Sequence, residues 1–459
     1  MRGASRSSVP NRRASRRPAG RASSGLPLWQ PLVAGLVASL PFQKGVPGLL
    51  VFAALVPFFV LLRLRGRELG LFAAFRAGWL FGVGFFLGLL YWIGLLSQTE
   101  IPVRAIAFVG LFALAAYLAF FPAVFALLFR LFDRRVPPRL FAPFLWGAIE
   151  HLRSLGPLGF PWGSLGYALA GHPTLIQSAR FASVDGLTWI VVLVNALLAE
   201  GLLLAAEKNV RSSALHFGAA ALVLLAAGAD GAGALGTPVE GAGPPLRVAV
   251  VQPNIRAEEK WTERYKEESI AILGEITRAA AAEDPDIDLV VWPETAVPVY
   301  VRHEHKYFKQ MFDLVDIAGV PILFGFPDAE YAAESGYKYY NSAMLIDEGG
   351  HVLGTYDKIH LVPFGERLPL TDRFAWVAAL NFGEADFSPG DDFALFPLGG
   401  TEFSANICFE AIFPGLCREF VRAGARFLVN LTNDAWFGTT SAPGQHAAMA
   451  RLRSVELGV

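Results

Sequence analysis

Cysteine is almost absent from this chain, and charged residues are scarce. Two of the 459 residues are cysteine, which excludes a disulfide scaffold and a cysteine-rich zinc or iron–sulfur site. Charged residues make up 17% of the chain, well below the share of about 25% in ordinary soluble domains. The formal net charge is −1, so the overall charge gives no indication of nucleic-acid binding.

Apolar residues take the place of the missing charges. Hydrophobic residues make up 54% of the sequence and the mean hydropathy is +0.42, which excludes global disorder. The 46 glycines and 30 prolines follow no period, so a collagen-like chain is excluded as well. The apolar runs are concentrated before residue 230, and the sequence therefore predicts two halves of different character.

The first half has the composition of a membrane protein. Residues 1–25 contain seven arginines and no acidic residue, which favours a basic N-terminal arm. A transmembrane domain is predicted over residues 26–230, because a spanning helix needs about 20 mainly apolar residues and such segments follow one another there. We predict seven spans, from the segments 22–43, 45–62, 77–99, 105–129, 140–152, 186–206 and 212–229.

Basic residues between these segments indicate the orientation. Lys and Arg gather in the N-terminal arm and in the connections 63–67, 130–139 and 208–211, which fall on one side if seven helices alternate. Because cytoplasmic connections carry the excess of Lys and Arg, we expect a cytoplasmic N-terminus. Everything after the seventh helix then lies on the extracytoplasmic side.

The second half has a different pattern. Residues 231–245 are rich in glycine and proline and are predicted to be a linker. Strands and helices are expected to alternate over residues 246–459, which predicts an α/β domain. The expected strands are 246–251, 288–292, 320–326 and 427–431, and the expected helices are 261–282, 303–315 and 415–425.

Three residues of this domain are candidates for chemistry. Cys408 follows a strand-like stretch and precedes a helix, and such a turn exposes a nucleophile beside backbone N–H groups. Glu294 ends a buried strand, at the edge where α/β domains bind ligands. Lys358 lies in the segment 356–366, where apolar residues and a Pro-Phe-Gly turn follow it. Each alone has a plainer interpretation, as an inert thiol or a solvated charge, and Cys417 in the following helix is expected to be inert.

Together, Glu, Lys and Cys in this order resemble the nitrilase, or carbon–nitrogen hydrolase, superfamily. The similar pieces are VQPNI at 251–255, VVWPETAVP at 290–298, YDKIHLVPFGE at 356–366, ICFE at 407–410 and NLTNDAWFG at 430–438. With the predicted helices in front, and GFPWGSLGY at 159–167, the whole chain resembles the bacterial apolipoprotein N-acyltransferase family. The resemblance implies a polytopic α-helical membrane domain followed by a nitrilase-like αββα sandwich.

The resemblance also implies a reaction. Cys408 would take an acyl chain from a phospholipid as a thioester, with Glu294 as general base and with Lys358 favouring the thiolate and holding the oxyanion. The chain would then pass to the α-amino group of the N-terminal diacylglyceryl-cysteine of an apolipoprotein. No metal or other cofactor is implied. The implied location is the inner (plasma) membrane, with the catalytic domain on its extracytoplasmic side.

Five further residues lie at positions of the family's active site, and one of them, Phe409, departs from the family pattern. Glu366 matches a second active-site glutamate, and Phe409 and Glu410 follow the nucleophile as supporting residues. Trp261 and Trp436 match positions for substrate binding. The alternative for Glu410 is a solvated acid, and the alternative for each tryptophan is a core position. The family usually has tyrosine in place of Phe409, so a hydroxyl hydrogen bond is lost while the backbone N–H is kept.

The end of the chain departs from the family pattern. Family members continue past this last helix with further strands and an eighth membrane helix. We therefore expect this chain to be C-terminally truncated.

Two other functions remain open at this point. A membrane-tethered amidase or nitrilase would use the same three residues with water as the acceptor. A transporter with an outer sensor domain would use Glu150 and Glu200 as charges within membrane segments. The plainer interpretation of these two acids is a position at a helix end.

Overall fold

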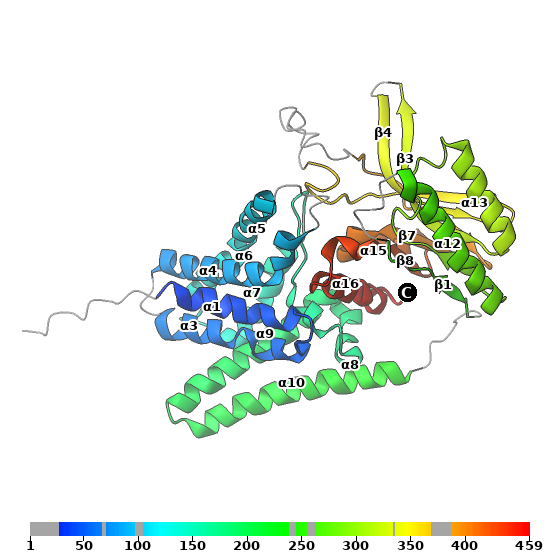
Figure 1. Ribbon diagram of the computed structural model, residues 1–459. Coiled ribbons are helices and arrows are strands. Elements are labelled where there is room, and N and C mark those ends of the chain that lie inside the picture. Colours follow the sequence, from blue (N-terminus) through cyan, green and yellow to red (C-terminus); the bar gives the residue numbers. More distant parts are fainter. Residues whose placement is uncertain are drawn as a thin grey trace, which may run out of the picture.

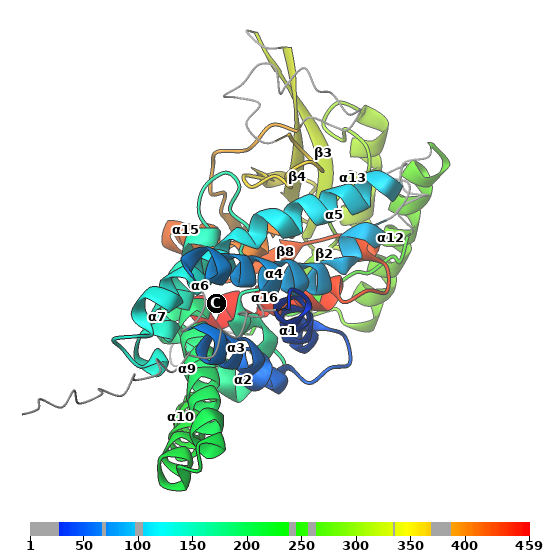
Figure 2. The same cartoon turned by 90° about the vertical axis from the view of Figure 1, so that its left-hand side faces the viewer.

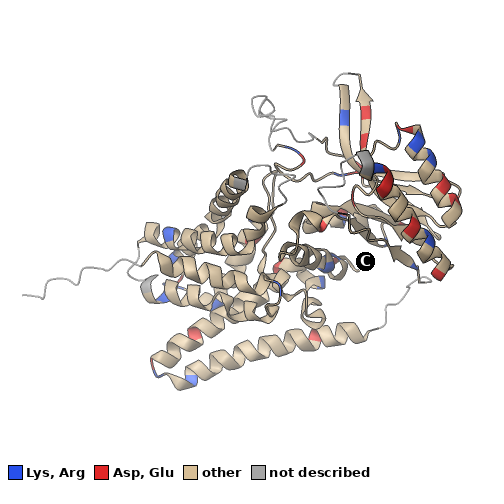
Figure 3. Cartoon of the chain, viewed as in Figure 1, with Lys and Arg blue, Asp and Glu red and all other residues tan. Residues whose placement is uncertain are grey.

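The structure, a computed structural model, describes residues 27–66, 70–96, 104–237, 245–255, 263–333, 336–368 and 387–459. The described chain forms a bundle of apolar helices and an α/β half with two sheets (Figure 1). Charged residues are dense on the outer helices of the α/β half and sparse across the helical half (Figure 3). The predicted basic arm lies outside the described residues.

The helices of the first half follow one another through short connections. Their bounds are α1 (Trp29–Ser39), α2 (Val51–Ala54), α3 (Val56–Gly66), α4 (Leu71–Leu89), α5 (Arg104–Leu118), α6 (Phe120–Phe132), α7 (Pro138–Arg153), α8 (Pro173–Ile176), α9 (Ala179–Ala206) and α10 (Val210–Gly236). Short 3-10 helices lie between some of them, namely η1 (Leu40–Phe42), η2 (Gly48–Leu50), η3 (Tyr91–Leu95) and η4 (Leu165–Leu169). Within the described residues, each of the seven predicted segments coincides with one or more of these helices.

In the described part of the chain, four helical stretches are long and apolar enough to cross a membrane. They are Leu71–Leu89, Ala105–Phe132, Ala179–Ala206 and Val210–Gly236. A helix suits the bilayer because it satisfies its own backbone hydrogen bonds. The last of these stretches, α10, packs mainly on α9 and projects from the bundle (Figure 2). The length and composition of these four stretches support a membrane domain. The count of seven membrane spans stays a prediction.

The predicted linker begins later than its composition suggests. The helix α10 continues through Gly236, so the prediction of a linker from residue 231 is wrong at that end. Two contacts hold this part of the helix. Arg180 pairs with Asp230 at 2.6 Å, and a Cβ on Gly231 would lie 1.6 Å from the carbonyl oxygen of Thr174. Close tertiary packing therefore overrides the low helix propensity of glycine.

Two sheets form the centre of the α/β half. The first has the order β1 (Val248–Val250), β2 (Leu289–Val291), β3 (Ile322–Ala332), β4 (Gly336–Ile346) and β5 (Val352–Asp357). Strands β1 to β3 are parallel, whereas β4 is antiparallel to both of its neighbours. In the second sheet, β7 (Thr401–Ile407) pairs antiparallel with β6 (Phe396–Leu398) and parallel with β8 (Leu428–Leu431).

Alternate residues of β2 enter two different cores. Leu289 and Val291 pack between the two sheets, and Val290 packs under the outer helices α12 (Glu263–Glu283) and α13 (His305–Ala318). Successive side chains of a strand point to opposite faces, so a strand that is buried on both faces is a continuous apolar run. On the far side, α15 (Pro414–Ala423) lies against β7. The predicted α/β sandwich is confirmed.

Part of the α/β half packs in the hydrophobic core of the helical half. The helix α16 (Ala442–Leu457) and the short helix η5 (Cys408–Ile412) belong to the α/β half by sequence, yet they lie against the helical bundle. Phe409 and Leu452 pack in the same apolar cluster as side chains of α3, α4, α7 and α9. In Figure 1, α16 lies between the two halves. This packing positions the turn that carries Cys408.

Candidate active site

Glu294, Lys358 and Cys408 each follow the carboxyl end of a strand. Glu294 comes after β2, Lys358 directly after β5, and Cys408 directly after β7. Glu294 is 7% exposed and Lys358 is 1% exposed, while Cys408 is partly exposed. Because the two sheets are packed face to face, residues from three distant segments of the sequence meet at one site.

Two carboxylates share the ammonium of Lys358. Its Nζ lies 2.9 Å from Glu366 Oε1 and 3.5 Å from Glu294 Oε1. Asn341 Nδ2 donates to the same two oxygens, at 2.9 Å to Glu294 and 2.8 Å to Glu366. Buried charges are tolerated in proteins when they are paired and hydrogen-bonded, and this cluster meets both conditions.

Backbone N–H groups hold the other oxygen of each carboxylate. The N–H of Asn433 donates to Glu294 Oε2 at 3.1 Å, and the N–H of Val362 donates to Glu366 Oε2 at 2.7 Å. Asn433 follows β8, so the second sheet takes part in orienting Glu294. Both carboxylates are therefore fixed in direction before any substrate binds.

The charges around Lys358 keep it cationic. Burial by itself would lower the pKa of this ammonium, but the carboxylates of Glu366 and Glu294 outweigh burial and hold the pKa above its usual range. A permanent cation beside Cys408 favours negative charge on sulfur or on a substrate oxygen.

Cys408 lies in a sharp turn between β7 and η5, residues Ile407–Glu410, which we call the Cys408 turn. Its φ angle is +49°, a left-handed conformation that is uncommon outside glycine. The predicted strand-to-helix turn is confirmed. Burial raises the pKa of the Cys408 thiol well above its usual range, the charge of Glu294 raises it further, and Lys358 opposes both. At neutral pH the resting side chain is a thiol, and a base is needed to make it nucleophilic.

The turns next to Glu294 and Glu366 also contain residues with strained backbone angles. Thr295, next to Glu294, has a φ angle of +48°, and Phe364, two residues before Glu366, has a φ angle of +65°. Such values cost about 1–3 kcal/mol each and persist only where the surroundings enforce them. Gly325 of β3 permits the turn at Glu294, because a Cβ there would lie 2.6 Å from the backbone nitrogen of Thr295. The fold therefore sustains strain at the places where it directs the candidate side chains.

Glu410 connects the Cys408 turn to the segment after β5. It is fully buried, and its Oε1 accepts hydrogen bonds from the hydroxyl of Tyr356 at 2.7 Å and from the N–H of Ile359 at 2.8 Å. Its Oε2 accepts from the N–H of Ile407 at 2.7 Å. The interpretation of Glu410 as a solvated acid is wrong, because the buried carboxylate links the Cys408 turn to the segment after β5 through hydrogen bonds.

The remaining predicted residues differ in their surroundings. The ring of Phe409 lies 6.4 Å from that of Phe160 and 5.2 Å from that of Phe413, so it fills an apolar site at the junction with the helical half. Trp436 lies in η6 (Asp434–Phe437) and is half-buried. Trp261 lies outside the described residues. The substrate-binding roles of both tryptophans stay predictions.

Three polar residues that the sequence patterns did not single out also belong to this region. Asn341 joins the two carboxylates from the middle of β4, and asparagine is depleted in strands, but the sequence patterns predicted no strand here in which it would stand out. Gln445 and His446 lie on α16. The Oε1 of Gln445 accepts hydrogen bonds from the indole nitrogens of Trp162 at 2.7 Å and Trp92 at 3.2 Å. The Gln-His pair on α16 carries no comparable local signal.

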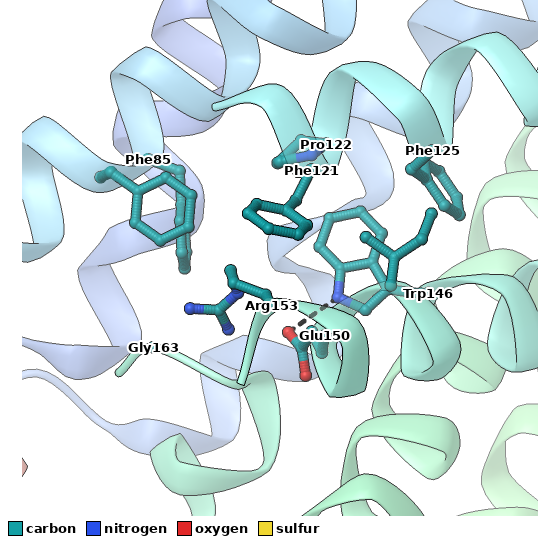
Figure 4. Close-up of a pocket in the computed structure, with 10 residues that line it drawn as sticks. Phe85, Phe121, Pro122, Phe125, Trp146, Glu150, Arg153 and Gly163 are labelled. Atoms are coloured by element: carbon teal, nitrogen blue, oxygen red, sulfur yellow. Dashed lines mark hydrogen bonds between the residues drawn. The ribbon is translucent and has the colours of Figure 1, made fainter. Parts of the chain in front are cut away.

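A small pocket in the helical half is lined by aromatic rings together with Glu150 and Arg153 (Figure 4). The carboxylate of Glu150 accepts from the N–H of Leu165 at 3.2 Å, and Arg153 Nη1 donates to the carbonyl oxygen of Trp162 at 2.6 Å. Both charges therefore hold the segment 159–167, which carries Trp162 to the junction with α16.

Together these groups offer a sulfur nucleophile, a carboxylate base and a fixed cation. This combination suits acyl transfer through a thioester, in which the base moves a proton and the cation stabilises an oxyanion. Among the described residues, no three His, Cys, Asp or Glu side chains come together as a possible metal site.

Comparisons with known proteins match both halves of the chain. The carbon-nitrogen hydrolase family matches residues 247–459, and the apolipoprotein N-acyltransferase N-terminal domain matches residues 34–197. An apolipoprotein N-acyltransferase from Geobacter metallireducens is 40% identical over 390 residues, which cover 83% of this chain and 73% of the relative. One from Chlorobaculum tepidum is 33% identical over 462 residues, which cover 94% of this chain and 83% of the relative.

Among solved structures, the similarity is more distant. An amidase from Nesterenkonia sp. is 19% identical with a TM-score of 0.30, and the match covers 41% of this chain and 64% of the amidase.

Proposed function

This chain belongs to the apolipoprotein N-acyltransferase family, and on that basis we propose that it N-acylates apolipoproteins with an acyl chain taken from a phospholipid. The acceptor is the α-amino group of the N-terminal diacylglyceryl-cysteine. The acyl chain is carried between the two substrates as a thioester on Cys408, and the product is a triacylated lipoprotein.

One structural observation gives the main support for membrane substrates. The short helix η5, which begins at Cys408, packs against the core of the helical half. Phe409 and Ile412 of η5 lie in the same apolar cluster as the membrane helices. A nucleophile next to membrane helices suits a donor and an acceptor that both reside in the bilayer. A hydrolase acting on a small soluble amide has no need of this arrangement.

In the first half-reaction, Glu294 accepts the thiol proton of Cys408, and the sulfur attacks the ester carbonyl carbon of the phospholipid. The carbonyl oxygen becomes an oxyanion, and the Lys358 ammonium and the N–H of Phe409 are its donors. Two N–H bonds of Lys358 serve Glu294 and Glu366, and the third serves the oxyanion. Collapse breaks the ester C–O bond, and the leaving lysophospholipid oxygen takes the proton from Glu294.

In the second half-reaction, the α-amino group attacks the thioester carbonyl carbon and Glu294 accepts a proton from the nitrogen. Collapse of the tetrahedral intermediate breaks the C–S bond, and the sulfur takes the proton from Glu294. The same oxyanion develops in both steps, so Lys358 and Phe409 act twice. Glu366 and Asn341 keep the base and the cation in place through the hydrogen bonds described above.

We further propose a multi-pass protein of the inner membrane with seven spans, a cytoplasmic N-terminus and an extracytoplasmic catalytic half. The basic connections 63–67, 130–139 and 208–211 support this orientation. The last of them joins α9 to α10, at the end of the helical half that is remote from the α/β half (Figure 1). A basic end and a catalytic half at opposite ends of the bundle agree with this arrangement.

The two alternatives receive less support. The match of the helical half to an acyltransferase domain disfavours a simple tethered amidase. For the transporter, Glu200 is paired with Arg139 and with His216, whose Nε2 lies 3.1 Å away, while Glu150 holds the segment 159–167. Both acids thus have structural partners, which disfavours a proton or ion pathway.

The test compares two acceptors. The protein, purified in detergent, is incubated with a phospholipid and a synthetic diacylglyceryl lipopeptide, and separately with a simple amide. We expect the lipopeptide to gain the mass of one acyl chain with an equal amount of lysophospholipid formed, and we expect no ammonia from the amide. Ammonia release without lipopeptide acylation would establish the amidase instead.

A further inference from the structure

The side chain of His446, on α16, contacts the backbone carbonyl oxygen of Cys408. This side chain is 3% exposed, and its Nε2 lies 3.0 Å from the carbonyl oxygen of Cys408. A carbonyl oxygen only accepts hydrogen bonds, so Nε2 is the donor. The Nδ1 of the same ring lies 3.1 Å from Asp434 Oδ1, which also accepts from the hydroxyl of Thr432 at 2.8 Å. The ring is therefore held at both nitrogens.

The carbonyl oxygen of Cys408 has a second donor. Asn430 Nδ2, in β8, lies 3.2 Å from it. A carbonyl oxygen has two lone pairs, and here one is directed to a strand of the second sheet and the other to α16. The two donors come from independent elements, so the carbonyl group is clamped from two directions.

Clamping this carbonyl fixes the direction of the next N–H. The peptide unit between Cys408 and Phe409 is planar and trans, so its C=O and N–H point in opposite directions as one rigid group. In the proposed mechanism the N–H of Phe409 is a donor to the oxyanion. The φ angle of +49° at Cys408 is unfavourable unless the surroundings enforce it, and the clamp supplies that enforcement.

We propose that His446 is a positioning residue for the oxyanion: together with Asn430, it holds the peptide between Cys408 and Phe409 so that the N–H of Phe409 points at the reacting carbonyl oxygen. This inference rests on the proposed role of Cys408 as the acylated residue. Since the oxyanion exists only in the transition state and intermediate, the loss of His446 acts on the rate of the bound complex and not on lipid binding.

The same histidine is supported by the helical half. Its ring stacks on Trp162, with centroids 6.0 Å apart and an interplanar angle of 16°. The neighbouring Gln445 accepts a hydrogen bond from the indole of Trp162, and Arg153 of α7 holds the backbone of Trp162. The membrane half thus contributes to the chemistry by holding α16 against the Cys408 turn.

The test uses three variants and a matched control. His446→Phe keeps an aromatic ring for stacking and removes both hydrogen bonds, whereas His446→Gln keeps an N–H donor on a side chain of similar reach. Asn430→Ala removes the other donor to the same carbonyl. The control is Ser454→Ala, an exposed position on the same helix. For each protein, the single-turnover rate of thioester formation on Cys408 is measured by intact mass over a range of phospholipid concentrations.

We expect His446→Phe to lower the saturating rate by about 10²-fold, as for the loss of an oxyanion donor, with the half-saturating lipid concentration unchanged within about twofold. His446→Gln should be at least about tenfold faster than His446→Phe. A wild-type rate in His446→Phe, or equal rates in the two variants, overturns the inference. Should His446→Phe fail to fold, as judged by thermal unfolding, the same fall in Asn430→Ala supports the clamp and a wild-type rate there overturns it. A wild-type protein that forms no thioester refutes the proposed function instead.

Discussion

The ammonium of Lys358 lies 3.5 Å from Glu294 Oε1, and both side chains are nearly sealed from solvent. Glu366 Oε1 lies 2.9 Å from the same ammonium. When both carboxylates are ionised, the cluster carries one more negative than positive charge, so ionising Cys408 next to it is opposed. Burial is the main cause of the raised pKa of the Cys408 thiol, and this charge balance adds to it, so the resting side chain is a thiol and a base is needed to ionise it.

Opposite shifts of the Cys408 pKa are expected when the two charges are removed one at a time. Glu294→Gln removes a negative charge that disfavours the thiolate, so it lowers the thiol pKa, whereas Lys358→Met removes the favourable cation and raises it. The rate of alkylation by iodoacetamide, followed against pH, reports the thiolate fraction. Midpoints that move in the same direction would contradict this assignment.

The activity of Glu294→Gln should fall although its thiolate fraction rises. Loss of a general base typically costs about 10²–10⁴-fold, and the variant still has the cation of Lys358. The measurement is the rate of thioester formation from phospholipid at fixed pH. An unchanged rate would show that Glu294 does not take the thiol proton.

The two cysteines should differ completely in acylation. Cys417 is fully buried, and burial raises the pKa of its thiol to about 12, so it stays protonated and inaccessible at neutral pH. We expect Cys408→Ala to abolish the thioester and Cys417→Ala to retain it, as read by intact mass after incubation with phospholipid. An adduct that persists in Cys408→Ala would place the acyl group elsewhere.

Substitution of Asn341 should lower the rate of acyl transfer, beyond any effect on folding. Asn341→Leu removes the donor shared by Glu294 and Glu366, so both carboxylates lose a fixed position, and a misplacement of about 1 Å can cost about 10²-fold in rate. Asn341→Asp, which adds a third carboxylate, should be slower still. Lys338→Ala, an exposed change on the same strand, is the control. Full acyl transfer by Asn341→Leu would argue against the shared donor.

The junction between the two halves should depend on Gln445. Gln445→Leu leaves the indole N–H groups of Trp92 and Trp162 buried without their acceptor, at about 1–3 kcal/mol each. We expect a lower midpoint of thermal unfolding in detergent, with Ser454→Ala unaffected. Equal midpoints for Gln445→Leu and the parent protein would mean that the junction is held by other contacts.

The membrane orientation can be read by labelling single cysteines. In a background of Cys408→Ala and Cys417→Ala, Glu348→Cys lies in the exposed turn between β4 and β5, and Arg134→Cys lies in the basic connection between α6 and α7. An impermeant maleimide should react with Glu348→Cys in intact spheroplasts and with Arg134→Cys only after permeabilisation. The reverse pattern would invert the proposed topology.

The sequence patterns did not predict the strand β4 or the C-terminal part of α10, and the structure gives a physical reason for each. The first part of β4 is rich in exposed tyrosine and lysine and its second part is continuously buried, so neither a period of two nor a uniform apolar run describes the whole strand. The helix α10 extends through a glycine-rich stretch because Gly231 and Asp230 have tertiary partners. Both cases follow from contacts with distant residues, which override local preference.

The sequence by itself determined the division into an apolar helical half and an α/β half, and it singled out Glu294, Lys358 and Cys408 as candidate site residues, which the structure brings together. Composition and apolar periodicity are properties of a local stretch of chain, and the motifs carry their own flanking residues, so these features need no tertiary information. Only the tertiary structure decided that Asn341 joins two carboxylates, that the buried Glu410 links two segments, and that α16 lies between the two halves. The physical reason is that a hydrogen bond between distant segments depends on how the sheets and helices pack. The residues that flank its donor and acceptor in the sequence do not encode that packing.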